Sequence, residues 1–190
     1  MTVLYAALGV SKHWVELSKI TGAPKNILYA YKPGEEKTGR VRNICSIFEQ
    51  YRSLGTQRIM IDSGAFSYRT GVEMADGGVT VPRSSGSRSA AGEYSKFIEK
   101  YLEFLFKVQR FVDYVVEFDV YETVSLAEIE ASVKSMAEIY GKDNVIRVWH
   151  PYLGRAVWEQ WCDEYQYVGL GDARKITDEE RADMLQFAVN

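Results

Sequence analysis

Polar side chains able to transfer protons or bind a ligand follow directly after an apolar run at residues 59–61. Asp62 comes first, followed by Ser63, Gly64 and, two residues later, Phe66. A carboxylate here could act as a general acid or base, or accept a hydrogen bond from a substrate N–H. A glycine lets a ligand approach the backbone closely, and an aromatic ring can stack on a flat one. The spacing predicts a ligand site, with a helix N-cap as the alternative for Asp62.

Three later apolar runs also end in polar residues or glycine: 114–120 contains Glu117 and Asp119, 145–149 leads into His150, and 167–170 leads through Gly169 and Leu170 to Gly171 and Asp172. Asp119 could accept the paired N–H donors of a nucleobase edge, and His150 could titrate or donate a hydrogen bond. The glycines would leave room for a planar ligand against the backbone. A helix N-cap for Asp119 and a structural hydrogen bond for His150 are the alternatives.

The elements that must position these residues alternate along the chain. Short apolar runs predict strands at 3–8, 26–31, 59–62, 114–120, 145–149 and 167–170. Apolar residues at helical spacing, with capping boxes at Ser125–Glu128 and Thr177–Glu180, predict helices at 12–20, 39–54, 93–111, 125–140, 155–164 and from about 177 almost to the end. The strands are nearly continuous apolar runs, which is typical of parallel sheets buried on both faces. We therefore expect an α/β fold with a (β/α)-barrel-like parallel sheet, in which strand ends share one edge.

Length and composition indicate one domain over residues 1–190. The chain has 46% hydrophobic residues and a formal net charge of −3, so its bulk charge does not indicate nucleic-acid binding, although a local basic patch is compatible with it. Cys45 and Cys162 lack CxxC spacing, and we interpret them as reduced thiols of a cytosolic protein. Neither a signal peptide nor a membrane span is predicted. We expect a cytoplasmic protein without a metal site, a cofactor or a membrane partner.

One stretch interrupts the alternation of strands and helices. Residues 76–92 are rich in Gly, Ser and Arg, which predicts a flexible surface loop. This loop would follow the third strand, at the functional rim of a parallel α/β fold. Arg83 and Arg88 could meet a phosphate there, and a tolerated insertion without function is the alternative.

Four segments together resemble the tRNA-guanine transglycosylase (queuine tRNA-ribosyltransferase) family. DSGAFS at 62–67 resembles the family's DSGGFQ and is closer still to the DSGAFS of phage-encoded queuine tRNA-ribosyltransferase-like proteins. FDVYE at 118–122 resembles the segment whose aspartate holds the guanine edge. VWHP at 148–151 falls where the family has a base-contacting Gln in VQG, and VGLGD at 168–172 falls where it has GGL. Order and spacing agree over about residues 3–172.

The resemblance implies a (β/α)8 barrel and an exchange of guanine for a 7-deazaguanine in tRNA, or in DNA for some phage relatives. An active member is a pentosyltransferase, and a phage-encoded one would work in the host cytoplasm. By resemblance, Asp62 would transfer protons, Phe66 would stack on the base and Asp119 would bind its edge. The remaining substrate-binding residues would be Ser63, Gly64, His150, Gly169, Leu170 and Gly171. His150 stands where the family uses Gln, which affects base specificity.

The family pattern also contains parts that this sequence does not match. The family's nucleophilic aspartate lies on the eighth strand, with a Cys3His zinc site after it, whereas six strands are predicted here. A full barrel takes ~250 residues. We therefore expect an incomplete TIM barrel of about six βα units. It would be completed by a partner chain, a second copy or a further segment, or it would be a reduced descendant with a rearranged sheet.

Three functions are compatible with these observations. The first is a transglycosylase-like protein that binds guanine or a 7-deazaguanine and exchanges bases in tRNA or DNA, with the nucleophile supplied from elsewhere. The second is a catalytically reduced protein that binds a nucleobase or nucleotide. The third is an N-glycosidase that uses Asp62, Asp119 and His150, with water as acceptor.

Overall fold

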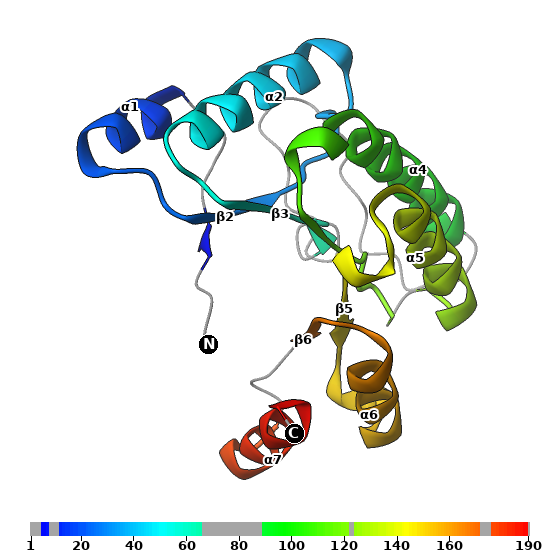
Figure 1. Ribbon diagram of the computed structural model, residues 1–190. Coiled ribbons are helices and arrows are strands. Elements are labelled where there is room, and N and C mark those ends of the chain that lie inside the picture. The colour runs from blue at the N-terminus through cyan, green and yellow to red at the C-terminus, as the bar shows by residue number, and fades with distance from the viewer. Residues whose placement is uncertain (1–4, 8–11, 66–88, 122–123, 172–175, 190) are drawn as a thin grey trace.

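A computed structural model describes residues 5–7, 12–65, 89–121, 124–171 and 176–189 (Figure 1). Its six strands form one sheet in which every neighbouring pair is parallel and the spatial order equals the chain order. The strands are β1 Ala6–Ala7, β2 Asn26–Ala30, β3 Arg58–Asp62, β4 Tyr114–Val116, β5 Val145–Trp149 and β6 Val168–Leu170. The sheet curls into a half-barrel, so the expected α/β fold with an incomplete (β/α) barrel is confirmed.

Helices α1 to α6 connect consecutive strands, α7 follows the last strand, and the helices lie along the outer side of the curled sheet (Figure 1). They are α1 Lys12–Thr21, α2 Thr38–Ser53, α4 Ser89–Val108, α5 Leu126–Tyr140, α6 Arg155–Glu164 and α7 Asp178–Val189, with short 3-10 turns at Gln109–Phe111, Lys142–Asn144 and Pro151–Leu153. A helix between parallel strands returns the chain to the starting edge. Every described strand therefore presents its carboxyl end at the same edge.

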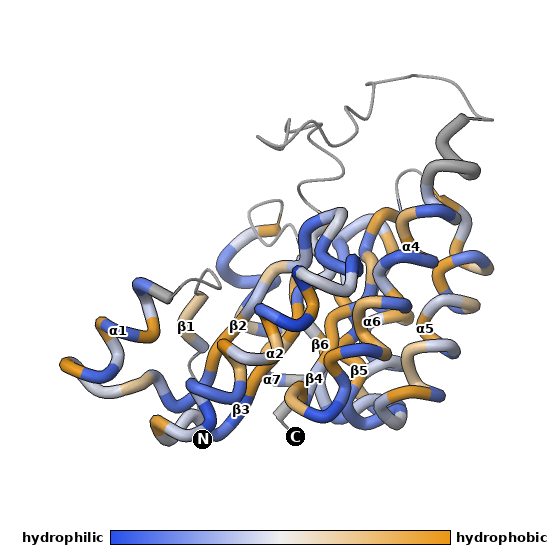
Figure 2. Tube along the Cα trace, turned by 90° about the horizontal axis from the view of Figure 1, so that it is seen from above, coloured by the Kyte–Doolittle hydropathy of each residue, from blue (hydrophilic) through white to orange (hydrophobic). Residues whose placement is uncertain are grey.

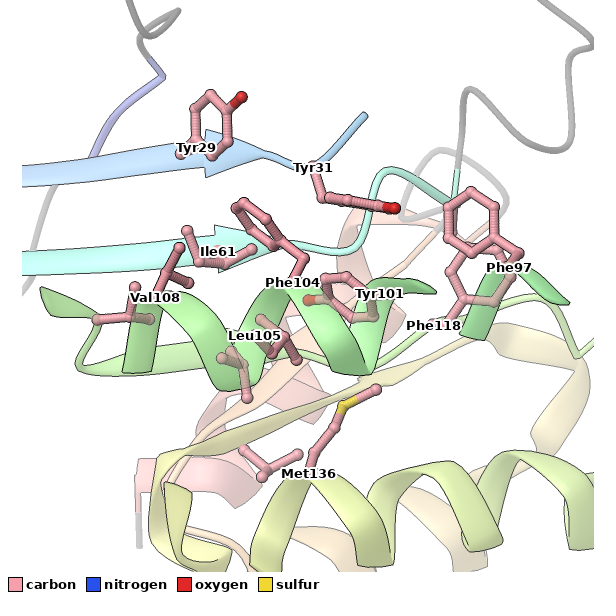
Figure 3. Close-up of a cluster of buried hydrophobic side chains, with 14 of the residues drawn as sticks. Tyr29, Tyr31, Ile61, Phe97, Tyr101, Phe104, Leu105, Val108, Phe118 and Met136 are labelled. Carbon is pink, nitrogen blue, oxygen red and sulfur yellow. The ribbon is translucent and has the colours of Figure 1, made fainter. Parts of the chain in front are cut away.

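The main core lies between the sheet and α2, α4 and α5. Strand side chains such as Ile59, Ile61 and Val115 are fully buried there. Figure 3 shows Tyr31 close to α4, where its ring centroid lies 5.2 Å from that of Tyr101. Complete burial of one such side chain stabilises the fold by ~1.5–3 kcal/mol.

Burial alternates along β2, β3 and β4, which corrects the expectation of burial on both faces for these three strands. In β5 the expectation is confirmed, since every residue except Val148 is buried. Ile59 and Ile61 face the helices, whereas Met60 between them is partly exposed on the concave inner face. Leu28 and Val116 are likewise partly exposed. The helices that the structure describes cover the outer face, and these apolar side chains on the inner face keep some contact with water. Hydrophilic and hydrophobic residues alternate along α4 and α5, as is typical of helices with one face against a core (Figure 2).

The two predicted capping boxes are present. At the start of α5 the Ser125 hydroxyl accepts from the Glu128 backbone N–H, while the Glu128 carboxylate accepts from the Ser125 backbone N–H at 3.1 Å. The same reciprocal pair joins Thr177 and Glu180 before α7. Each box satisfies two helix N–H groups that have no partner within the helix.

Several element boundaries differ from the sequence-based expectation by one to four residues, and the two largest differences are at the end of β4 and the start of α4. β4 ends at Val116 instead of residue 120, because the Glu117 side chain enters a buried ion pair and the Val120 N–H turns back to the Phe118 carbonyl oxygen at 3.0 Å. Phe118 itself is buried, with its ring stacked on Phe97 at 4.3 Å. α4 begins at Ser89, so residues 89–92 of the predicted loop are helical.

Some expectations fall outside the described residues. They are the loop at 76–88 with Arg83 and Arg88, the stacking residue Phe66, and Asp172. None of the helices that the structure describes is long and apolar enough to cross a lipid bilayer.

Candidate functional site

Asp62 ends β3 with a partly buried carboxyl group. Burial raises the pKa of Asp62 above its ordinary value of 3.8, and the nearby charge of Asp119 raises it further. Hydrogen bonds from the backbone N–H groups of Gly64 and Ser63 favour the carboxylate and oppose this shift. A raised pKa increases the fraction of the carboxyl group that can donate a proton at neutral pH.

The two residues after Asp62 hold the turn in place. Gly64 has a φ of 71°, and a β-carbon on it would clash with the carbonyl oxygen of Tyr31. The Ser63 side chain is fully buried, and its hydroxyl lies 3.4 Å from the Ala65 backbone N–H. In this structure Gly64 therefore allows close packing against Tyr31, the residue after β2, and the Ser63 hydroxyl lies within the turn itself.

Asp119 and His150 are in direct contact, although 31 positions separate them in the chain. Asp119 follows β4, His150 follows β5, and 2.9 Å separates the Asp119 Oδ2 from the His150 Nε2. The imidazole side chain is 2% exposed, whereas the Asp119 side chain is 20% exposed. Solvent or a ligand therefore reaches this pair through the carboxylate.

Aromatic rings and a glycine enclose the His150 ring. Tyr152 lies parallel to it at a centroid distance of 5.3 Å, and Tyr121 meets it edge-on at 6.0 Å. A β-carbon on Gly171 would lie 2.5 Å from the imidazole. The space beside Gly171 is therefore filled by His150, and the exposed ring of Tyr152 borders the site.

The β6 residues contribute to the same edge in different ways. The Gly171 backbone N–H donates to the Trp149 carbonyl oxygen at 2.7 Å, which fixes the end of β6 against β5. Leu170 packs in a cluster around Trp149 and Trp158. A β-carbon on Gly169 would make ordinary contacts, the closest at 3.5 Å, so no clash requires glycine there.

The structure thus brings together Asp62, Asp119, His150 and Gly171 at the carboxyl ends of β3 to β6, as their positions after successive parallel strands predicted. Sequence reasoning missed Tyr152, which has no apolar periodicity to mark it. Glu117 was grouped with the strand-end residues, yet its carboxylate points away from them into a buried ion pair with Arg147. The charge inside the apolar run at 145–149 was the available signal for this pair.

Other features lie away from these residues. A hollow of about 650 Å³ is lined by Gln109, Arg110, Val112, Asp113, Tyr114, Ile139, Tyr140 and Asn144, at the amino ends of β4 and β5. It is therefore at the opposite end of the strands from Asp62. Among the described residues, no three His, Cys, Asp or Glu side chains gather in a way that could hold a metal ion.

Comparisons with known proteins identify no relative of this chain. No family model, no curated protein and no solved structure matches the chain.

Proposed function

We propose that the group formed by Asp62, Asp119 and His150 binds guanine or a 7-deazaguanine and acts on its N-glycosidic bond, as in base exchange by transglycosylases. The observation that supports this most is the raised pKa of Asp62 beside the Asp119–His150 pair. One carboxyl group is thereby suited to hold a proton, and the other to accept hydrogen bonds.

Each group has a role in this proposal. Asp119 accepts N–H donors of the base through the oxygen that does not contact His150. Asp62 gives its proton to the ring nitrogen of the leaving base as the bond to C1′ breaks. A carboxylate from a partner chain, a second copy or a further segment bonds to C1′. The incoming base then attacks C1′, returns its proton to Asp62 and releases that carboxylate.

A hydrolytic reaction is the second candidate, and the 2.9 Å contact between Asp119 and His150 favours it. Asp119 is the exposed member of this pair, so it would take a proton from water while the His150 Nε2–H holds its orientation. The water oxygen would bond to C1′, the bond to the base would break, and Asp62 would protonate the leaving base.

Calorimetric titration with guanine, 7-deazaguanines and guanine nucleotides tests the shared part of both candidates. We expect binding by the wild-type chain and a loss of ~1–3 kcal/mol in affinity for Asp119→Ala, since one base edge loses its acceptor. Asp143→Ala, which removes an exposed carboxylate at the amino end of β5, is the matched control and should bind as the wild type does.

Radiolabelled guanine distinguishes exchange from hydrolysis. Incorporation of label into tRNA or DNA indicates exchange, whereas release of free base without incorporation indicates hydrolysis. We expect Asp62→Asn to slow either reaction about 10²–10⁴-fold. Failure of every base and nucleotide to bind would overturn the proposal.

A further inference from the structure

A buried arginine lies behind the site on the helix side of β5. The Arg147 side chain is 1% exposed and makes five hydrogen bonds, the full capacity of a guanidinium. Its Nε donates to Glu117 at 2.8 Å, its Nη1 to Glu130 and Tyr165, and its Nη2 to Glu130 and Tyr121. We call these five residues the Arg147 cluster.

The Glu117 carboxylate is held equally firmly. Its side chain is fully buried, and its Oε1 accepts from the Tyr121 hydroxyl and from the Val148 backbone N–H, both at 2.6 Å. The Glu117 backbone N–H donates to the Ile146 carbonyl oxygen at 3.0 Å. Residue 117 is therefore fastened to β5 by both its backbone and its side chain.

These hydrogen bonds lie on both sides of Asp119 in the chain and just before His150. Asp119 lies between Glu117 and Tyr121, the two cluster residues on its own segment. His150 follows Arg147 and Val148, which bind that segment from β5. Tyr121 also meets the His150 ring edge-on at 6.0 Å. The cluster thus fixes both ends of the Asp119 segment relative to the strand that carries His150.

Any other arrangement of a buried, fully bonded ion pair would leave a charge without its hydrogen bonds, which is costly. Such a pair therefore keeps one geometry. Trp161 adds a further restraint, since the Arg147 guanidinium lies 3.9 Å from its ring centroid. We infer that Glu117 and Arg147 are positioning residues that hold Asp119 in contact with His150. This role rests on the proposed function of that contact, although the contact itself can be measured without it.

The chain contains a matched control pair at the other end of the same strands. Asp113 binds Arg52 at 2.6 Å and accepts from the Ile59 backbone N–H at 2.6 Å, as Glu117 binds an arginine and a neighbouring strand's N–H. It lies at the amino ends of β3 and β4, away from His150. Asp113→Asn and Glu117→Gln therefore make the same chemical change at opposite ends of the strands.

The test is the imidazole ¹⁵N spectrum of the full chain at fixed pH. Its two histidines are His150 and the exposed His13, which serves as an internal reference. We expect Glu117→Gln to move or broaden the His150 signals, and Asp113→Asn to leave them unchanged. Tyr121→Phe keeps the ring but removes the hydroxyl that donates to Glu117 and accepts from Arg147, while the Glu117–Arg147 ion pair stays. This variant should shift the same signals less, and it serves if Glu117→Gln fails to fold.

Affinity for guanine provides the second readout. We expect Glu117→Gln to weaken binding about tenfold, because misplacing a binding group by 1 Å can cost up to ~100-fold, and Asp113→Asn to stay within about twofold of the wild type. Unchanged His150 signals in a folded Glu117→Gln variant would overturn the positioning role. If only Tyr121→Phe folds, unchanged His150 signals in that variant would overturn it. Shifted signals in a chain that binds no base would support the role and refute the proposed function alone.

Discussion

At the scale of single residues, Asp62 combines burial with two backbone hydrogen bonds that favour its charge. Burial is the larger effect, and the charge of Asp119 adds to it, so the pKa of Asp62 is raised. Ionisation of this group therefore costs more in the folded chain than in the unfolded one. Its contribution to stability is complete below the ordinary value of 3.8 and is lost as pH rises through the folded-state pKa.

We expect Asp62→Asn to be more stable than the wild type by ~1 kcal/mol at pH 8, because it removes a carboxyl group whose ionisation burial and Asp119 disfavour. The difference should shrink as pH falls towards 4, because the wild-type carboxyl group then becomes neutral too. Urea unfolding at a series of pH values measures it. Asp143→Asn, at an exposed site, should show no such trend, and a gap that widens in acid would contradict the assignment.

At the scale of elements, the end of β6 packs directly on the end of β5. Gly171 is attached through its N–H to Trp149 and leaves no room for a side chain beside His150. Gly169, two residues earlier on the same strand, has ordinary space around a β-carbon. The two glycines thus separate the effect of a side chain on the site from its effect on the strand.

We expect Gly171→Ala to destabilise the chain by ~1–3 kcal/mol, because the added methyl group must displace the imidazole. Gly169→Ala should change stability by less than ~1 kcal/mol and serves as the matched control. Thermal unfolding measures both, and the His150 ¹⁵N signals report whether the ring has moved. Equal stability of the two variants would show that the His150 ring can move aside at no cost in stability.

At the scale of the whole molecule, the two faces of the sheet differ in how they are covered. Ile61 on the outer face is fully buried against the helices, whereas Met60 on the inner face is partly exposed. These neighbours on β3 provide a direct comparison of the faces.

Ile61→Ala should cost ~2–5 kcal/mol, as for other core truncations, and Met60→Ala about 1 kcal/mol, because less of that side chain leaves water on folding. Urea unfolding at two protein concentrations measures these losses. An equal loss of stability at both positions would show that the inner face is covered in solution. A loss for Met60→Ala alone that depends on protein concentration would show the same.

Local signals in the sequence predicted most of the fold. The bounds of β5 and α6 and both capping boxes were correct, because each depends on neighbouring residues. The length of β4 was wrong, since Glu117 pairs with an arginine 30 positions away and periodicity does not register such a partner. The inner-face exposure was also missed, because an apolar run does not reveal which face a helix covers.

The candidate site was partly predictable for the same reason. Positions after successive parallel strands placed Asp62, Asp119 and His150 at one edge. The contact between Asp119 and His150 depends on how the segment after β4 turns. The Arg147 cluster holds this turn and joins that segment to α5, β5 and the residue after α6. Such long-range bonding leaves little trace in a single sequence.

The strands lie side by side in the sheet in the same order as in the chain, and this order affects how the chain folds. Each strand pairs with its predecessor, so the sheet can grow stepwise as the polypeptide leaves the ribosome. The connection at 63–113, between β3 and β4, is nearly twice as long as the one at 31–57, and each doubling of a loop adds about 0.6 kcal/mol to the entropy cost of closing it. We therefore expect β3–β4 pairing to be the slow step of sheet growth. That step brings Asp62 beside Asp119, so the site would assemble late, after the β1–β3 portion has formed.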